Sequence, residues 1–203
     1  MKTVPMLLTL STLSLSAFAQ DLALPAPQKT GGKPLMVALA ERKSTRQYAA
    51  RDLDQQTLAN LLWAANGFNR ADRRTAPSAK NQQEIDLYVF LKTGVYFYDA
   101  KSNTLKLTVS GDHRKTAGTQ EFVATAPVSL VFVANLDKLP GGRDMVSADC
   151  GFISQNVYLY CASANLATVV RAGVDKKALA ELLKLKPTQE AMFNQPIGYF
   201  LTL

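Results

Sequence analysis

The chain is poor in the residues on which most catalytic and metal sites depend. Its 203 residues include one histidine, His113, and two cysteines, Cys150 and Cys161. A single histidine excludes metal sites built from several histidines, and the cysteines lack metal-ligand spacing, so the sequence predicts no metal centre. His113 lies in the polar stretch SGDHRKT, which favours a solvated loop position over the role of base in a catalytic triad. Because glycine-rich phosphate loops are also missing, an enzyme of this sequence would need a cofactor for its difficult chemistry.

The two cysteines are not expected to form a disulfide with each other. They lie eleven residues apart in an apolar segment with a helical pattern. At a rise of 1.5 Å per residue their Cα atoms would be about 16 Å apart, whereas a disulfide needs about 7 Å or less. We therefore expect both thiols to fill space in the core.

Long hydrophobic runs suited to membranes are missing after the N-terminus. Residues 1–19 begin with Lys2 next to the first methionine, continue with an uncharged, largely apolar stretch, and end in Ala17-Phe18-Ala19. This is the pattern of a secretory signal peptide cleaved near Ala19. We therefore expect an exported protein, periplasmic or secreted, with no stable membrane anchor.

Residues 20–33 contain prolines and two adjacent glycines, and we expect them to form a flexible lead-in to one domain over residues 34–203. Without Lys2 the chain keeps 22 basic and 16 acidic residues, a net charge of +6. No dense run of lysine and arginine and no nucleic-acid motif accompany this charge. A small anionic ligand explains a local basic cluster better than nucleic acid does.

Helical and strand patterns are mixed along the chain. Helices are expected over residues 34–41, after the N-cap candidate Asp54, over residues 144–165 and after Asp175. Strands are expected at residues 85–91, 95–99, 104–109, 128–135, 166–173 and 197–203, with an irregular loop over residues 70–84. Residues 128–135 are β-branched and apolar, which is typical of a central strand covered on both faces. This order predicts an α+β fold with a central sheet.

Three polar clusters are candidates for a binding site. The first places Arg42, Lys43, Ser44 and Arg46 directly after the helix of residues 34–41. Two guanidinium groups and a hydroxyl are suited to a phosphate. Cations at the end of a helix also complement its dipole, and the residues alone do not decide between these two roles.

The second and third clusters are weaker on their own. In APSAKNQQE, Pro77 fixes a turn in which Ser78 and Asn81 present polar groups that suit a heteroaromatic ring, although a plain turn is the simpler interpretation. In TVVRAG, the turn at Arg171 and Ala172 would leave backbone N–H groups able to bond a ligand atom that gains charge. An ordinary connection between a strand and a helix is the simpler interpretation here too.

In order and spacing, the stretches ERKSTRQY, APSAKNQQE and ANLATVVRAGVD resemble the nitroreductase family of FMN flavoproteins. LLWAANGFNR, RRTAPSA and GVYFYD look most like its SagB-type dehydrogenase branch. The resemblance runs from about Pro34 to Tyr199. It implies an α+β homodimer with a central mixed or antiparallel sheet flanked by helices, and with FMN at the subunit interface.

By the same resemblance, Arg42, Lys43, Ser44 and Arg46 would hold the phosphate and ribityl region of FMN. Pro77, Ser78 and Asn81 would approach the flavin from the partner subunit.

Backbone amides of Arg171 and Ala172 would face flavin N5 and O4. The helix around residues 150–159 would build the dimer core.

The chain departs from the family pattern at several points. Many members carry a further basic residue after the PIGY-like strand, whereas QPIGYFLTL has none. The phosphate would then depend on the first cluster or on another cation such as Arg114. Lys43 stands where arginine is more usual, and Arg171 stands where some relatives carry an acid, which would favour negative charge on the reduced flavin.

The resemblance implies an exported FMN-dependent oxidoreductase. It would pass hydride through flavin N5 in a ping-pong cycle, from a small-molecule donor to an acceptor of the nitro or quinone type. The alternative is a non-catalytic module of the same fold that binds flavin or another anionic ligand. Azoline oxidation is not supported, because the lysine and tyrosine that it needs cannot be placed.

Overall fold

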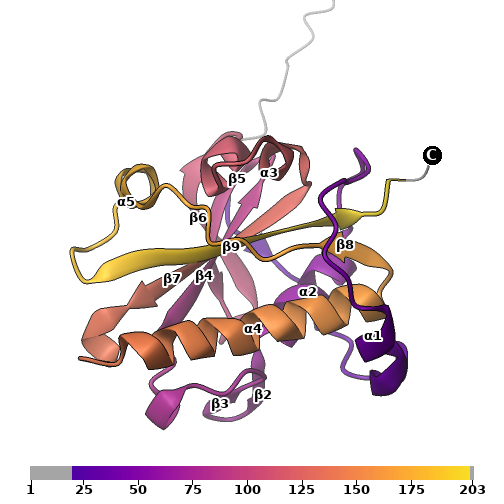
Figure 1. Ribbon diagram of the computed structural model, residues 1–203, viewed down its shortest axis with the longest axis horizontal. Coiled ribbons are helices and arrows are strands. Elements are labelled where there is room, and N and C mark those ends of the chain that lie inside the picture. Colours follow the sequence, from indigo (N-terminus) through magenta and orange to yellow (C-terminus); the bar gives the residue numbers. More distant parts are fainter. Residues whose placement is uncertain (1–19, 202–203) are drawn as a thin grey trace, which may run out of the picture.

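The computed structural model describes residues 20–201, so the signal peptide expected over residues 1–19 lies outside the described part. Seven strands form one sheet in the order β1-β6-β5-β4-β7-β9-β8, with every neighbouring pair antiparallel. Helices cover the sheet (Figure 1), which confirms the predicted α+β class and gives an antiparallel rather than a mixed sheet.

The strands are β1 (Leu22–Ala23), β2 (Phe68–Arg70), β3 (Arg73–Arg74), β4 (Ile85–Leu91), β5 (Gly94–Asp99), β6 (Thr104–Ser110), β7 (Val128–Asn135), β8 (Leu166–Thr168) and β9 (Gln189–Tyr199). The α-helices are α1 (Leu35–Glu41), α2 (Gln55–Asn66), α3 (Glu121–Thr125), α4 (Arg143–Ser163) and α5 (Lys176–Leu183). Three short 3-10 helices are η1 (Ala79–Asn81), η2 (Arg114–Ala117) and η3 (Leu136–Lys138).

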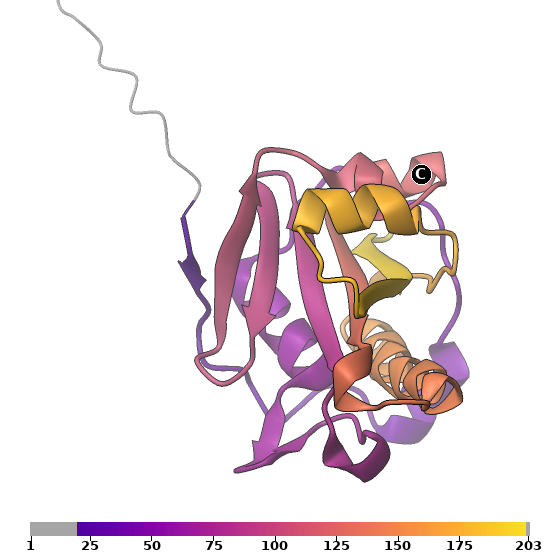
Figure 2. The same cartoon turned by 90° about the vertical axis from the view of Figure 1, so that its left-hand side faces the viewer.

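The central strands bury both faces of the sheet. Successive side chains of a strand point to opposite faces, and on β4 Leu87 and Val89 join one apolar cluster while Tyr88 and Phe90 join another. The first cluster includes side chains of α2 and α4, and the second includes side chains of α5 and α3. Figures 1 and 2 show α4 and α5 on opposite sides of β9. β7 lies between β4 and β9, as its apolar sequence predicts.

Helix boundaries follow the capping residues. The carboxylate of Asp54 accepts a hydrogen bond from the N–H of Thr57 at 2.7 Å, and Asp175 accepts one from Ala178 at 3.0 Å. These bonds satisfy N–H groups that would otherwise lack a partner in the first turn. No helix within residues 20–201 is both long enough and apolar enough to span a bilayer.

Helix α4 buries one stripe of its surface against the sheet. Val146, Cys150, Ile153, Val157 and Cys161 recur every three or four residues and pack on the sheet. Both cysteines are free and buried, as expected from their separation. On the opposite side of the helix the apolar residues Met145 and Phe152 are 55% and 46% exposed, which leaves them available to another surface.

Three segments differ from the sequence prediction. The flexible lead-in expected over residues 20–33 contains strand β1, in which Leu22 pairs with Leu105 of β6. The edge of β6 offers backbone groups for pairing, and composition alone does not reveal that. Residues 70–84, expected as a loop, include the end of β2 and all of β3, which pair as a hairpin.

Strand β9 also begins at Gln189, earlier than the expected residue 197, because it pairs with almost all of β7.

Candidate functional site

The first cluster follows directly after α1. Arg42 leaves helical geometry with φ −56° and ψ 123°, and the chain then runs beside β8, where the N–H of Thr45 donates to the carbonyl of Thr168 at 2.9 Å. Tyr48 pairs with Phe200 in an isolated antiparallel bridge. Arg42, Lys43 and Arg46 are thus anchored through the backbone, while their side chains make no ion pair with a carboxylate among the described residues.

Tyr158 of α4 connects this cluster to the third one. Its hydroxyl hydrogen-bonds the Ser44 hydroxyl at 2.9 Å and accepts the N–H of Val170 at 3.0 Å. The Arg42 guanidinium carbon lies 5.2 Å from the centre of the Tyr158 ring, and Lys43 Nζ lies 4.9 Å from that of Phe200. The sequence analysis missed Tyr158. A phenol in a buried helical stripe needs a hydrogen-bond partner, and this was the available signal.

A cavity of about 230 Å³ opens beside these residues. Its lining includes Glu41, Lys43, Tyr158, Thr168 and Phe200, and Glu41 is paired with Lys33. It therefore combines a cation, a paired carboxylate, hydroxyl groups and an aromatic ring where α1, α4, β8 and the end of β9 meet.

The third cluster differs from expectation at one backbone group. The N–H of Arg171 donates to the carbonyl of Asn194 at 2.7 Å, and the N–H of Asn194 donates back to Arg171 at 2.9 Å. The Arg171 amide is therefore occupied by the protein, because β9 runs beside this segment. Ala172 is exposed, and its N–H donates no hydrogen bond to any of residues 20–201.

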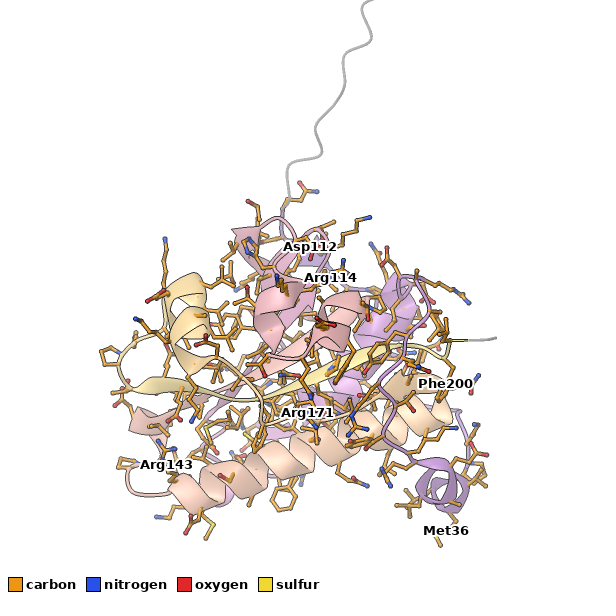
Figure 3. All side chains as sticks on the ribbon, turned by 45° about the horizontal axis from the view of Figure 1, so that its top comes forward. Met36, Asp112, Arg114, Arg143, Arg171 and Phe200 are labelled. Carbon is orange, nitrogen blue, oxygen red and sulfur yellow. The ribbon has the colours of Figure 1, made fainter. Side chains whose placement is uncertain are left out.

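The side chain of Arg171, unlike its backbone amide, is left with an unused hydrogen-bond donor. Its Nε is buried and has no hydrogen-bond partner within the described chain. Figure 3 marks its position in the middle of the molecule. A buried donor without an acceptor is costly, so this position favours a ligand that supplies one.

Arg114, the other cation considered for a phosphate, is already engaged. Its Nε and Nη2 donate to the two carboxylate oxygens of Asp112 at 2.9 and 2.7 Å, and its Nη1 donates to the carbonyl of Ala126 (Figure 3). The Arg114 hydrogen bonds lower the pKa of Asp112 below its usual value, which keeps the pair ionised. The neighbouring His113 uses Nε2 on the carbonyl of Ser110 at 3.0 Å.

The second cluster forms a tightly bonded turn at η1 that contacts another part of α4. The Ser78 hydroxyl accepts the N–H of Gln83 at 3.0 Å, and the Asn81 amide donates to the carbonyl of Asp72 at 3.2 Å. The N–H of Ala79 donates to Asp149 at 2.7 Å. Lys80, Asn81 and Gln83 all have positive φ, so these contacts hold an unusual backbone in place.

One chain does not bring all three clusters together. The second cluster is bonded to Asp149 and the first to Tyr158, which are nine residues apart on α4, or about 14 Å along its axis. The first and third clusters meet at Tyr158, whereas Pro77, Ser78 and Asn81 lie apart from them.

A buried carboxyl pair supports the Ser78–Asn81 turn. Glu84 and Asp149 are 0% and 3% exposed, and neither oxygen of Glu84 has a donor partner within residues 20–201. Burial, the largest cause, and the neighbouring Asp149 carboxyl raise the pKa of Glu84 to about 7, and the backbone N–H of Glu84 and the charge of Lys138 offset this only in part. A proton held by Glu84 can be shared with Asp149, which leaves Asp149 able to accept the N–H of Ala79.

The Glu84→Gln variant should change how stability depends on pH. The unfolded glutamate titrates near pH 4.3, so between about pH 4.5 and 7 the folded chain binds more protons and its stability falls as the pH rises. The loss should be on the order of 2–3 kcal/mol for the native protein and absent in Glu84→Gln. Urea unfolding from pH 4.5 to 8 measures it.

Glu181→Gln, at an exposed position on α5, is the matched control and should keep the native pH dependence. Parallel pH profiles for the native protein and Glu84→Gln would contradict the assignment of the proton to Glu84.

The chain is similar to a known protein family and to solved structures. The model of the nitroreductase family matches residues 39–199. In sequence, the chain is 38% identical to a candidate nitroreductase from Ralstonia eutropha JMP134 whose crystal structure is known. The two structures superpose with a TM-score of 0.86, and 100% of both chains is covered. A comparison with curated proteins finds no match.

Two more distant structures share the fold. An FMN-dependent nitroreductase from Clostridium difficile R20291 is 18% identical, with 83% of this chain and 88% of that chain covered and a TM-score of 0.61. A chain of the E. coli microcin synthetase McbBCD complex, with truncated pro-MccB17 bound, is 18% identical, with 99% of this chain and 85% of that chain covered and a TM-score of 0.68.

Proposed function

The chain belongs to the nitroreductase family, and from this premise we propose that it is an exported FMN-dependent oxidoreductase acting on small organic acceptors of the nitro or quinone type. The observation that carries the proposal is the group of three cations, Arg42, Lys43 and Arg46, beside a cavity that Lys43 lines. None of them is paired with a carboxylate of the described chain. An FMN-dependent enzyme among its distant structural relatives supports the choice of cofactor.

The donor groups fit the phosphate end of FMN. Guanidinium groups of Arg42 and Arg46 are suited to bidentate contacts with phosphate oxygens, and the Ser44 hydroxyl is held in place by Tyr158. The buried Nε of Arg171 offers a further donor and a positive charge to an electron-rich part of the ligand. Bound FMN would supply hydride transfer through N5, from one substrate to the next in a ping-pong cycle.

We propose that the active unit is a homodimer with shared sites. The Ser78–Asn81 turn and the Arg42–Arg46 segment are separated along α4 in one chain, so a second copy is needed to bring them to one ligand. Exposed apolar side chains support such contact: Met36 on α1 (Figure 3) is 74% exposed, and Met145 and Phe152 on α4 are 55% and 46% exposed. Large exposed apolar surfaces are typical of interaction sites.

Anaerobic reduction tests the function. The purified mature protein should be yellow, and addition of NADH, NADPH or another donor should bleach the flavin absorbance near 450 nm within the time of turnover. Dithionite is the positive control for reducible flavin. A yellow protein that no donor bleaches would instead support a non-catalytic flavin-binding module, and a colourless protein that does not take up FMN would contradict both.

Arg46→Ala should weaken FMN binding by about 1.5–3 kcal/mol, because it removes a charged hydrogen-bond donor from a phosphate. Fluorescence quenching on titration with FMN measures the dissociation constant. Arg51→Ala is the matched control, because Arg51 is stacked at 4.1 Å on the Tyr199 ring, outside the cluster, and it should bind normally. Equal affinity of Arg46→Ala and the native protein would remove Arg46 from the site.

Met36→Glu combined with Phe152→Glu should produce a monomer with little bound flavin, because charges replace apolar side chains at the proposed contact. Analytical ultracentrifugation and the flavin-to-protein ratio provide the measurements. Lys101→Glu combined with Lys177→Glu, at exposed positions elsewhere, is the control. A monomeric native protein with full flavin occupancy would contradict the shared site.

A further inference from the structure

A second pocket lies on the β2–β3 hairpin and the turn that follows it. Its volume is about 500 Å³, within the range of pockets that bind small molecules. Four cations line it, namely Arg70, Arg73, Arg74 and Lys80, and no carboxylate of the described residues is part of the lining. The pocket is therefore concave and strongly positive.

Most of this positive charge is not balanced inside the protein. Arg73 forms an ion pair with Asp72. Arg70 contacts only the side-chain oxygen of its neighbour Asn69, at 3.3 Å, and Lys80 makes no ion pair with any of residues 20–201. At least two charges thus face the pocket without a carboxylate partner, and such charges attract anions.

Arg74 forms a rigid wall of the same pocket. Its Nε donates to Gln83 at 3.0 Å, its Nη1 donates to the carbonyl of Asn66 at 2.9 Å, and its guanidinium carbon lies 4.2 Å from the centre of the Phe68 ring. Burial lowers the pKa of Arg74, although an arginine stays charged at neutral pH. An anion in the pocket would offset the cost of this partly buried charge.

Another part of the lining is the Ser78–Asn81 turn, in which the backbone N–H of Ala79 donates to Asp149 and the side-chain amide of Asn81 donates to the carbonyl of Asp72. Lys80 has φ 52° within this turn, and both Ser78 and Asn81 line the pocket. Arg74 and the turn therefore form a preformed surface, to which the exposed side chains of Arg70 and Lys80 add charge.

We propose that this pocket binds the anionic group, a carboxylate or a phosphate, of a small-molecule substrate that exchanges electrons with the cofactor, and that Arg70 and Lys80 are its main contacts. The inference rests on the proposed function, because Ser78 and Asn81 line this pocket and are also the residues expected to reach the cofactor of the partner subunit. A bidentate guanidinium suits both kinds of oxyanion. The size of the pocket favours a small molecule over an extended polymer.

The test compares three nitroaromatic acceptors of similar size: p-nitrobenzoate, p-nitrophenyl phosphate and the neutral p-nitrobenzyl alcohol. In Arg70→Gln combined with Lys80→Gln, KM for at least one of the two anions should rise about tenfold, while KM for the alcohol stays the same. The anion that is affected identifies the group that the pocket prefers. Raising the salt concentration should weaken the native preference for that anion and have little effect on the double variant.

Lys101→Gln combined with Lys177→Gln is the matched control, because it removes the same charge from exposed positions outside the pocket. It should leave all three KM values unchanged, which separates a local contact from an effect of net charge. Circular dichroism and flavin content check that both double variants fold. Equal KM values for the anions in native and pocket variants, or an equal change for the neutral alcohol, would overturn the proposal.

A direct binding measurement keeps the two proposals apart. If the native protein reduces no acceptor, the proposed function fails, and calorimetric titration with p-nitrobenzoate and with p-nitrophenyl phosphate still tests the pocket. Binding of either anion to the native protein that is lost in Arg70→Gln combined with Lys80→Gln supports the inference. No binding, or equal binding to both proteins, overturns it.

Discussion

The apolar strand β7 requires cover on both of its faces, and the rest of the structure depends on that cover. Seven of its eight residues are buried, and leaving that apolar surface in water would cost roughly 25 cal/mol per Å². The cover on one face is α4, held by its stripe from Val146 to Cys161. The same helix carries Tyr158, which bonds Ser44 and Val170, and Asp149, which bonds Ala79. The requirement to cover the sheet therefore also positions the candidate site.

The two polar residues on α4 explain why the site is divided. Tyr158 gathers the first and third clusters near the C-terminal end of the helix, and Asp149 holds the Ser78–Asn81 turn nearer its N-terminal end. A rigid helix keeps these positions apart, so no rearrangement of loops within one chain joins them easily. A shared site between two copies is consistent with this separation and with the exposed apolar residues of α1 and α4.

Two groups of cations without a carboxylate partner among the described residues lie at cavities. Lys43 lines one cavity, with Arg42 and Arg46 near it in the chain, and Arg70 and Lys80 line the other pocket. Some cations elsewhere are matched locally, as Arg114 is with Asp112, whereas others, such as Lys101, form no ion pair with any of residues 20–201. The cations at the two cavities are therefore placed to attract small anions.

The sequence by itself determined the class of the fold, the capped starts of α2 and α5, the doubly covered β7 and the cation cluster after α1, because these depend on local periodicity and on neighbouring residues. Only the tertiary structure decided which groups are occupied. Arg171 donates its amide to Asn194 and Arg114 binds Asp112 and Ala126, and Tyr158 and the Glu84–Asp149 pair became visible only in the folded chain. These contacts join residues that are mostly far apart in sequence, and their bonding depends on burial and distance, which no local pattern encodes.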